Sequence, residues 1–87
     1  MVNASDNAFT LFPNPNKGVF SIVQRSSEDE IVSAHLYTAL GQELYSGNIE
    51  FKSGVATFKV ANALPGMYLL CLKGKDHKTS CIKFSIQ

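Results

Sequence analysis

Residues 67–86 read MYLLCLKGKDHKTSCIKFSI, with two apolar runs on either side of a hydrophilic centre. When the stretch is folded about that centre, Leu70 comes opposite Ile82 and Tyr68 comes opposite Phe84. Both pairs then lie on one face, because side chains alternate between the two faces of a strand. The stretch therefore predicts a β-hairpin with one apolar face.

This hairpin register also decides where the two cysteines lie. Asp76 is midway between Cys71 and Cys81, so the two cysteines are directly opposed on the face away from the apolar pairs. Directly opposed Cβ atoms are about 4.5–5.5 Å apart, whereas a relaxed disulfide has them about 3.8 Å apart. A bridge is therefore feasible at a non-hydrogen-bonded pair and strained elsewhere, and the sequence leaves open whether it forms.

Strand periodicity also dominates the chain before the hairpin. In the segment 31–38, for example, Val32, Ala34 and Leu36 alternate with polar and aromatic residues. No stretch of ten or more residues fits a helix better than a strand. The expected strands cover residues 8–11, 18–24, 31–38, 42–45, 55–60, 67–72 and 81–86.

Seven short strands separated by turn residues favour two antiparallel sheets packed face to face. We therefore predict an all-β chain that forms an Ig-like antiparallel β-sandwich of about seven short strands. A small barrel is the competing architecture. The 87 residues suffice for one domain. Residues 9–87 are expected to form it, and residues 1–8 are expected to be a linker from whatever precedes them.

Proline and glycine mark the turns between these strands. Pro13-Asn14-Pro15 predicts an extended elbow, because proline fixes its own φ and disfavours the helical region for the residue before it. Asn16-Lys17-Gly18 is expected to turn the chain into the next strand. Ala39-Leu40-Gly41 predicts a hairpin loop. Leu64-Pro65-Gly66-Met67 predicts a type II turn with proline and glycine at its central positions.

The charge balance argues against several classes of partner. The formal net charge is +1, so no basic excess draws the chain to nucleic acid or to anionic lipid. No run of 18 apolar residues occurs, and we therefore expect no direct membrane insertion. The acidic run at residues 28–30 is interpreted as a solvated loop, and the basic cluster at residues 73–78 as the tip of the terminal hairpin.

No motif in the chain predicts catalysis or the binding of a cofactor or metal. There is no GxSxG elbow and no glycine-rich phosphate loop, and two cysteines ten residues apart lack the second ligand pair of a zinc site. His35 is interpreted as a cross-strand packing partner, and His77 is expected to point away from the hairpin tip. Tyr37 and Tyr45, near one turn, are the candidates for a sugar-stacking platform. We expect no catalytic, cofactor-binding or metal-binding residue and no enzyme activity.

Several ordered motifs resemble those of a known family. The chain carries LFPNP at 11–15, GVF at 18–20, LY at 36–37, LGQEL at 40–44 and LPGMYLL at 64–70, followed by a final strand. In this order and spacing they resemble the type A C-terminal sorting domain of the type IX (Por) secretion system of Bacteroidetes. The resemblance covers residues 9–87.

The resemblance implies a non-catalytic secretion signal that directs a cargo protein through the outer membrane. It implies outer-membrane type IX translocon components and a sortase as partners, and an upstream cargo domain in the same polypeptide. The cargo would be secreted or displayed on the cell surface via the periplasm, with cleavage within residues 1–8. The residues expected to carry the motifs and recognition are Pro13, Asn14, Pro15, Gly18, Gly41, Leu64, Pro65, Gly66, Tyr68, Lys83, Phe84 and Ile86.

The chain also departs from the family pattern. Thr38 stands where many members have aspartate, residues 83–87 lack the usual run of basic and β-branched residues, and the two cysteines are not part of the pattern. The alternative function is a fibronectin-like adhesive or carbohydrate-binding β-sandwich module. For the sorting function, we expect edge strands to pair with a translocon component by strand addition, and proline or a charge within residues 82–86 to abolish export.

Overall fold

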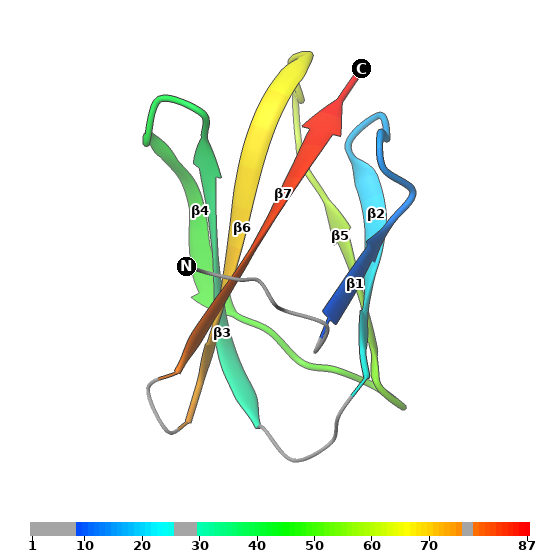
Figure 1. Cartoon of the computed structure of the whole chain (residues 1–87), viewed down its shortest axis with the longest axis vertical. Helices are drawn as coiled ribbons and strands as arrows, with labels where there is room; N and C mark the ends of the chain where they lie inside the picture. Colours follow the sequence, from blue (N-terminus) through cyan, green and yellow to red (C-terminus); the bar gives the residue numbers. More distant parts are fainter. Residues whose placement is uncertain (1–8, 26–29, 76–77) are drawn as a thin grey trace.

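The computed structural model describes residues 9–25, 30–75 and 78–87, and every regular element in this described part is a strand (Figure 1). It contains no helix that is long and apolar enough to cross a membrane. The strands are β1 (Phe9–Phe12), β2 (Val19–Gln24), β3 (Ile31–Thr38), β4 (Glu43–Asn48), β5 (Val55–Lys59), β6 (Gly66–Gly74) and β7 (Thr79–Ile86). The predicted strand bounds differ from these by at most three residues.

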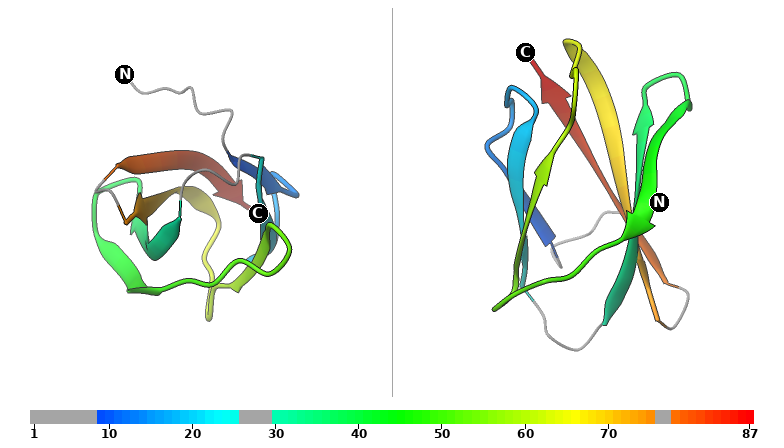
Figure 2. Two further views of the ribbon diagram at one scale, coloured as in Figure 1. Left: turned by 90° about the horizontal axis from the view of Figure 1, so that it is seen from below. Right: turned by 180° about the vertical axis from the view of Figure 1, so that it is seen from behind.

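The strands form two sheets that face each other (Figures 1 and 2). One sheet has the order β1-β2-β5 and the other has the order β4-β3-β6-β7. All neighbouring strands within them are antiparallel. The predicted Ig-like sandwich is therefore confirmed. The competing barrel is wrong, because no described strand of one sheet forms a ladder with a strand of the other.

The apolar faces of both sheets form one core. Phe20 and Ile22 of β2 and Leu70, Leu72 and Phe84 of β6 and β7 are almost completely buried. The rings of Phe20 and Phe84 lie 4.7 Å apart between centroids, so they join the two layers directly. Burial of such side chains is the main favourable term in the stability of a sandwich this small.

The terminal hairpin has the predicted register. In the β6–β7 pair, Tyr68 is opposite Phe84 and Cys71 is opposite Cys81. The side chains of both strands that pack in the core therefore fall on the inner face, whereas the cysteines fall on the outer face. The tip, with Asp76 and His77, and the acidic residues 28 and 29 lie outside the described residues.

The start of β3 differs from the prediction. Ile31 is opposite Gly74 and Ser33 is opposite Lys73, so Val32 is an extra residue in a bulge. A bulge shifts the alternation of side chains by one residue. Ile31 consequently packs against the core, and Val32, which was expected to face inward with Ala34, is exposed.

The turns also contain one correction. The segment before β6 is not a type II turn, since Gly66 has a φ of 152° and is already the first residue of β6. A type II turn requires a φ of about 80° at that position. The hairpin loop at 39–41 is confirmed, because Gly41 donates its N–H to the carbonyl oxygen of Thr38. In the elbow, the Phe12–Pro13 and Asn14–Pro15 peptide bonds are both cis.

Replacing Phe20 tests the contact that joins the sheets. Phe20→Ala should lower the free energy of unfolding by about 3–5 kcal/mol, because it removes a buried ring and leaves a cavity. Urea denaturation of the purified chain measures the change. Phe12→Ala is the control, since Phe12 is 48% exposed. An equal loss in both variants would contradict the assigned core.

Candidate functional site

The elbow between β1 and β2 crosses to the other sheet and pairs with the end of β7. We call residues 13–18 the asparagine loop. The backbone N–H of Asn16 donates to the carbonyl oxygen of Ser85 at 3.1 Å, and the N–H of Gln87 donates to the carbonyl oxygen of Asn16 at 2.8 Å. Asn16 and Ile86 are parallel bridge partners. These bonds connect the three-stranded sheet to the four-stranded sheet.

The side chain of Asn16 holds the loop in its shape. Asn16 is 5% exposed; its Nδ2 donates to the carbonyl oxygen of Pro13 at 3.0 Å and its Oδ1 accepts from the N–H of Gly18 at 2.8 Å. The buried amide therefore has partners for both its donor and its acceptor. Asn14 adds a contact to β7, since its Oδ1 accepts from the N–H of Ser85 at 3.1 Å.

Gly18 ends the loop at a position that only glycine fits without strain. Its φ is 106°, and an added Cβ would lie 3.1 Å from the Cβ of Ala63. The carbonyl oxygen of Gly18 accepts from the N–H of Val60 at 2.7 Å. The loop is thus fixed against the segment after β5 as well as against β7.

The segment before β6 forms a second fixed corner. The hydroxyl of Tyr68 donates to the carbonyl oxygen of Leu64, four residues earlier in the chain. This arrangement is a tyrosine corner, a hallmark of immunoglobulin-like sandwiches, where it secures the entry to the corresponding strand. Gly66, between the two residues, pairs with Ile86.

Three of the sequence motifs therefore meet at the end of β7. Ile86 has Gly66 of the tyrosine corner on one side and Asn16 of the asparagine loop on the other. Pro13, Asn14, Pro15 and Gly18 belong to that loop, and Leu64, Pro65 and Tyr68 to that corner. Phe84 and Ile86 are buried in the core below. We define this assembly, residues 13–18, 64–68 and 84–87, as the candidate site.

Two of the expected recognition residues lie elsewhere, and one essential residue was missed. Gly41 is in the β3–β4 loop, and Lys83 is an exposed residue within β7. Asn16 was predicted only as part of a turn. Its signal in the sequence is an amide between a proline and a glycine, which is typical of asparagine side chains that bond to their own turn.

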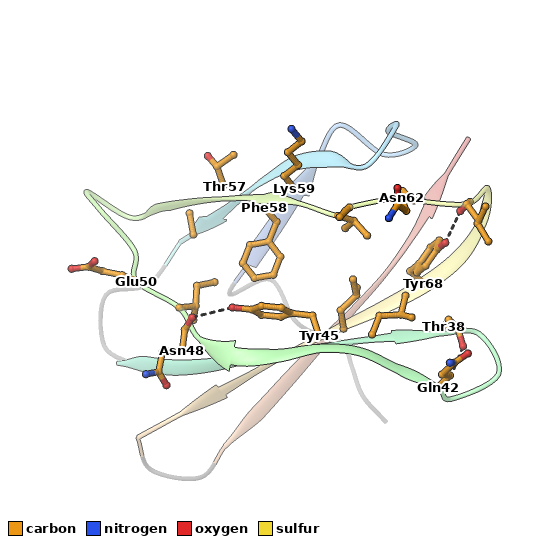
Figure 3. Close-up of a pocket in the computed structure, with 18 residues that line it drawn as sticks. Thr38, Gln42, Tyr45, Asn48, Glu50, Thr57, Phe58, Lys59, Asn62 and Tyr68 are labelled. Atoms are coloured by element: carbon orange, nitrogen blue, oxygen red, sulfur yellow. Dashed lines mark hydrogen bonds between the residues drawn. The ribbon is translucent and has the colours of Figure 1, made fainter.

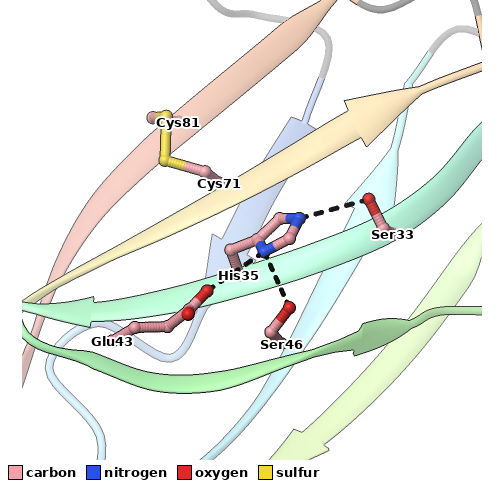
Figure 4. A network of polar contacts seen from close by, with 6 residues as sticks. All are labelled: Ser33, His35, Glu43, Ser46, Cys71 and Cys81. Atoms are coloured by element: carbon pink, nitrogen blue, oxygen red, sulfur yellow. Dashed lines mark hydrogen bonds and ion pairs between the residues drawn. A yellow bond between two sulfur atoms is a disulfide. The ribbon is translucent and has the colours of Figure 1, made fainter.

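The disulfide lies on the outer face of the terminal hairpin (Figure 4). Cys71 and Cys81 are bonded through their sulfur atoms, and their Cα atoms are 4.0 Å apart. The N–H and C=O of Ser85 both bond to the asparagine loop, so they point away from β6. Because backbone groups alternate in direction along a strand, the other odd-numbered residues of β7 also point theirs away from β6. Cys71 and Cys81 are therefore a non-hydrogen-bonded pair, the closer of the two kinds in an antiparallel ladder.

A small polar network lies beside the disulfide on the same face (Figure 4). His35 has its Nδ1 3.3 Å from Glu43 Oε2 and 3.1 Å from Ser46 Oγ, and its Nε2 3.3 Å from Ser33 Oγ. This agrees with the interpretation of His35 as a cross-strand partner, since the contacts link β3 to β4. Among the described residues, no group of three or more His, Cys, Asp and Glu could hold a metal ion.

A cavity of about 690 Å³ opens between β4 and β5, where the two sheets diverge (Figure 3). Its walls are mainly apolar. The ring of Tyr45 lies across Gly47 and meets Phe58 edge-on at 5.6 Å between centroids. The hydroxyl of Tyr45 donates to the carbonyl oxygen of Asn48 at 3.4 Å.

Tyr37 and Tyr45, the candidates for a stacking platform, lie on opposite faces of the sheet. Tyr45 is opposite the buried Leu36 and faces inward, whereas Tyr37 follows Leu36 and faces outward. Tyr37 is opposite Glu43 and Leu36 is opposite Tyr45, so Leu44 is an extra residue in a bulge. The bulge shifts the alternation of side chains by one residue, and this shift puts Tyr45 on the face opposite to that of Tyr37. The two candidate tyrosines therefore do not share a surface.

A model of the secretion system C-terminal sorting domain matches residues 10–87. The chain belongs to this family. As a type IX sorting domain, it is associated with the type IX secretion machinery and with export to the cell surface or the medium. The matched range includes the whole candidate site.

The fold of the sorting domain is similar to that of a DUF3244 family protein from Bacteroides vulgatus, whose crystal structure has an immunoglobulin-like β-sandwich fold. The TM-score is 0.71 at 20% identity, and the similarity covers 100% of this chain and 93% of that chain. At this identity the likeness concerns the fold alone. Among curated protein sequences, none matches the chain.

Removing the buried amide tests the asparagine loop. Asn16→Ala should lower the free energy of unfolding by about 1–3 kcal/mol, because it leaves the N–H of Gly18 and the carbonyl oxygen of Pro13 without this partner. Chemical denaturation measures the change, with Asn48→Ala as the control, since Asn48 is exposed. Equal stability of Asn16→Ala and the unmodified chain would show that the loop is held by its backbone alone.

Removing the cross-link tests the disulfide. The double variant Cys71→Ala/Cys81→Ala should be about 2–3 kcal/mol less stable than the oxidised chain. Without the bridge, the unfolded chain is no longer restricted by a closed loop of about ten residues, so its entropy is higher. A reductant should destabilise the unmodified chain and leave the double variant unchanged. Two titratable thiols in folded protein purified from an oxidising compartment would contradict the bridge.

Proposed function

We propose that this domain is the signal by which a larger polypeptide is directed through the outer membrane by the type IX secretion system. The family match over residues 10–87 carries the proposal. The signal has no chemistry of its own and acts as a folded shape that the translocon binds. Its partners are outer-membrane translocon components, a sortase, and the cargo domain that precedes it in the polypeptide.

The arrangement of the site supports recognition of the domain in its folded state. Residues 84–87 pair with Gly66 on one side, and on the other side backbone bonds hold the asparagine loop, which is far from them in the chain. A receptor that contacts this end of the sandwich would therefore meet one fixed surface and not a flexible tail. Pre-organisation of this kind lowers the entropy lost on binding.

Release of the cargo follows in this proposal. A sortase cleaves within residues 1–8, which lie outside the described part of the chain, and the cargo reaches the cell surface or the medium. The strand β1 begins at Phe9. Cleavage before that residue would leave all seven strands of the sandwich together.

The alternative is a fibronectin-like adhesive or carbohydrate-binding module, and the cavity between β4 and β5 is the feature that favours it. Its polar side chains do not converge, however. Thr57 and Lys59 point away from it, and Gln42 and Glu50 lie at its opposite ends (Figure 3). Binding of the isolated domain on a glycan array would favour this alternative.

A reporter fusion tests the sorting function. A signal peptide and a fluorescent protein are placed before residues 1–87 and expressed in a bacterium with a type IX system. Fluorescence should appear at the cell surface or in the medium, and it should be lost when the translocon is disabled. Folded reporter retained in the periplasm would contradict the proposal, provided that a known sorting domain exports the same reporter.

Proline or a charge within residues 82–86 is expected to abolish export. At Phe84 the result would be ambiguous, because Phe84 is 1% exposed and even-numbered residues of β7 bond to β6, so the change would also unfold the domain. A decisive variant must alter an exposed residue of β7 while leaving intact the buried side chains and the hydrogen bonds between β6 and β7.

A further inference from the structure

The outer edge of β7 is divided into two parts. At its end, the N–H and C=O of Ser85 bond to Asn14 and Asn16. Backbone groups alternate in direction along a strand, so Thr79, Cys81 and Lys83 point their N–H and C=O to the same side. None of the described strands pairs with β7 on that side. Residues 79–83 therefore form a free edge, and residues 85–87 do not.

This division limits where an added strand can pair within residues 82–86, the stretch in which proline or a charge is expected to abolish export. Within residues 82–86, the N–H and C=O of Ser85 are already occupied by the asparagine loop, and those of the even-numbered residues bond to β6. Only Lys83 has backbone groups available for another strand. A strand that pairs with β7 must therefore lie along residues 79–83.

The hairpin that carries this edge is rich in lysine. Four of the eight Lys and Arg residues of the chain lie within residues 73–83. Lys73, Lys75 and Lys83 are exposed. Lys83 is on the outer face of β7, opposite Leu69, so its ammonium group would meet side chains of an added strand on that face. Opposite charges at such cross-strand positions attract, and like charges repel.

A simpler function for a lysine at a sheet edge is protection against aggregation. Charged residues, lysine above all, prevent edge strands from pairing with other copies. In that function any charge would suffice, and a glutamate at position 83 would serve as well as the lysine. A specific partner would distinguish the two charges.

We propose that the free edge of β7 at residues 79–83 binds an extended strand of a translocon protein, and that this strand carries acidic side chains facing Lys83. The inference rests on the proposed sorting function and adds a contact on the part of β7 that directly precedes the candidate site. Main-chain hydrogen bonds supply the affinity in such strand addition, and side chains supply the choice of partner. The Cys71–Cys81 bond fixes the free edge to β6 in the middle of this stretch, so little ordering is needed on binding.

Two substitutions of Lys83 separate the backbone from the charge. Lys83→Pro removes an N–H that points away from β6, so the internal ladder stays intact, as proline at a sheet edge allows. Lys83→Glu keeps the N–H and reverses the charge. The reporter fusion described above measures export. Lys83→Pro should reduce it about tenfold or more through the lost hydrogen bond, and Lys83→Glu should reduce it severalfold through repulsion.

Lys59 provides a matched control on the other sheet. It is an exposed lysine on β5, an edge strand that has β2 as its one neighbour among the described strands. The N–H of Val60 bonds to Gly18, just before β2, and the carbonyl oxygen of Gly54 bonds to Gln24 of β2, so the backbone groups of Lys59, one residue out of phase, point away from β2. Lys59→Pro and Lys59→Glu should both be exported normally. Thermal unfolding of each purified variant verifies that it is folded before export is compared.

The outcomes distinguish this inference from the sorting function itself. If unmodified residues 1–87 do not export the reporter, the sorting function fails. If they do, but folded Lys83→Pro is exported normally, strand addition at β7 is wrong. Normal export of Lys83→Glu would contradict an acidic partner and leave lysine its protective function. Loss of export in the Lys59 variants instead would overturn the proposal by moving the contact to β5.

Discussion

The structure depends on the backbone pairing of Asn16 with the end of β7. The core side chains hold the two sheets face to face, but apolar contacts alone do not specify how one sheet is placed along the other. The asparagine loop does, because its hydrogen bonds to Ser85 and Gln87 are directional. The loop also leads directly into β2, which carries Phe20. Its position therefore determines which residues of β2 meet Phe84 across the core.

Local patterns in the sequence predicted most of the fold. Alternation predicted the position of each strand, and the spacing of the cysteines about Asp76 predicted the register of the terminal hairpin. The bulges at Val32 and Leu44 could not be predicted in this way. A bulge is an extra residue in one strand of a pair, and its position depends on the partner strand. Those bulges decide that Val32 is exposed and that Tyr37 and Tyr45 lie on opposite faces.

The candidate site shows the same limit. The sequence contained each motif, and the resemblance connected the motifs to one family. The sequence did not predict that the motifs lie together at the end of β7. Asn14 and Ser85 are 71 residues apart. No periodicity links them, because the contact is made by a loop and not by a repeating element. The contact of the asparagine loop with Ser85 covers the end of β7 and leaves residues 79–83 as the free edge. The sequence alone therefore could not predict the extent of that edge.

The path of the asparagine loop has a consequence for synthesis of the chain. A ribosome makes Asn16 well before Ser85 and Gln87, so the backbone of Asn16 lacks these partners until the end of β7 has been translated. A polypeptide truncated before Ser85 would leave the backbone groups of Asn16 and the amide of Asn14 unpaired at the junction between the sheets. The closed sandwich thus records that this domain has been translated through Gln87, and a receptor that binds only the closed form would reject products truncated within the domain without inspecting the cargo.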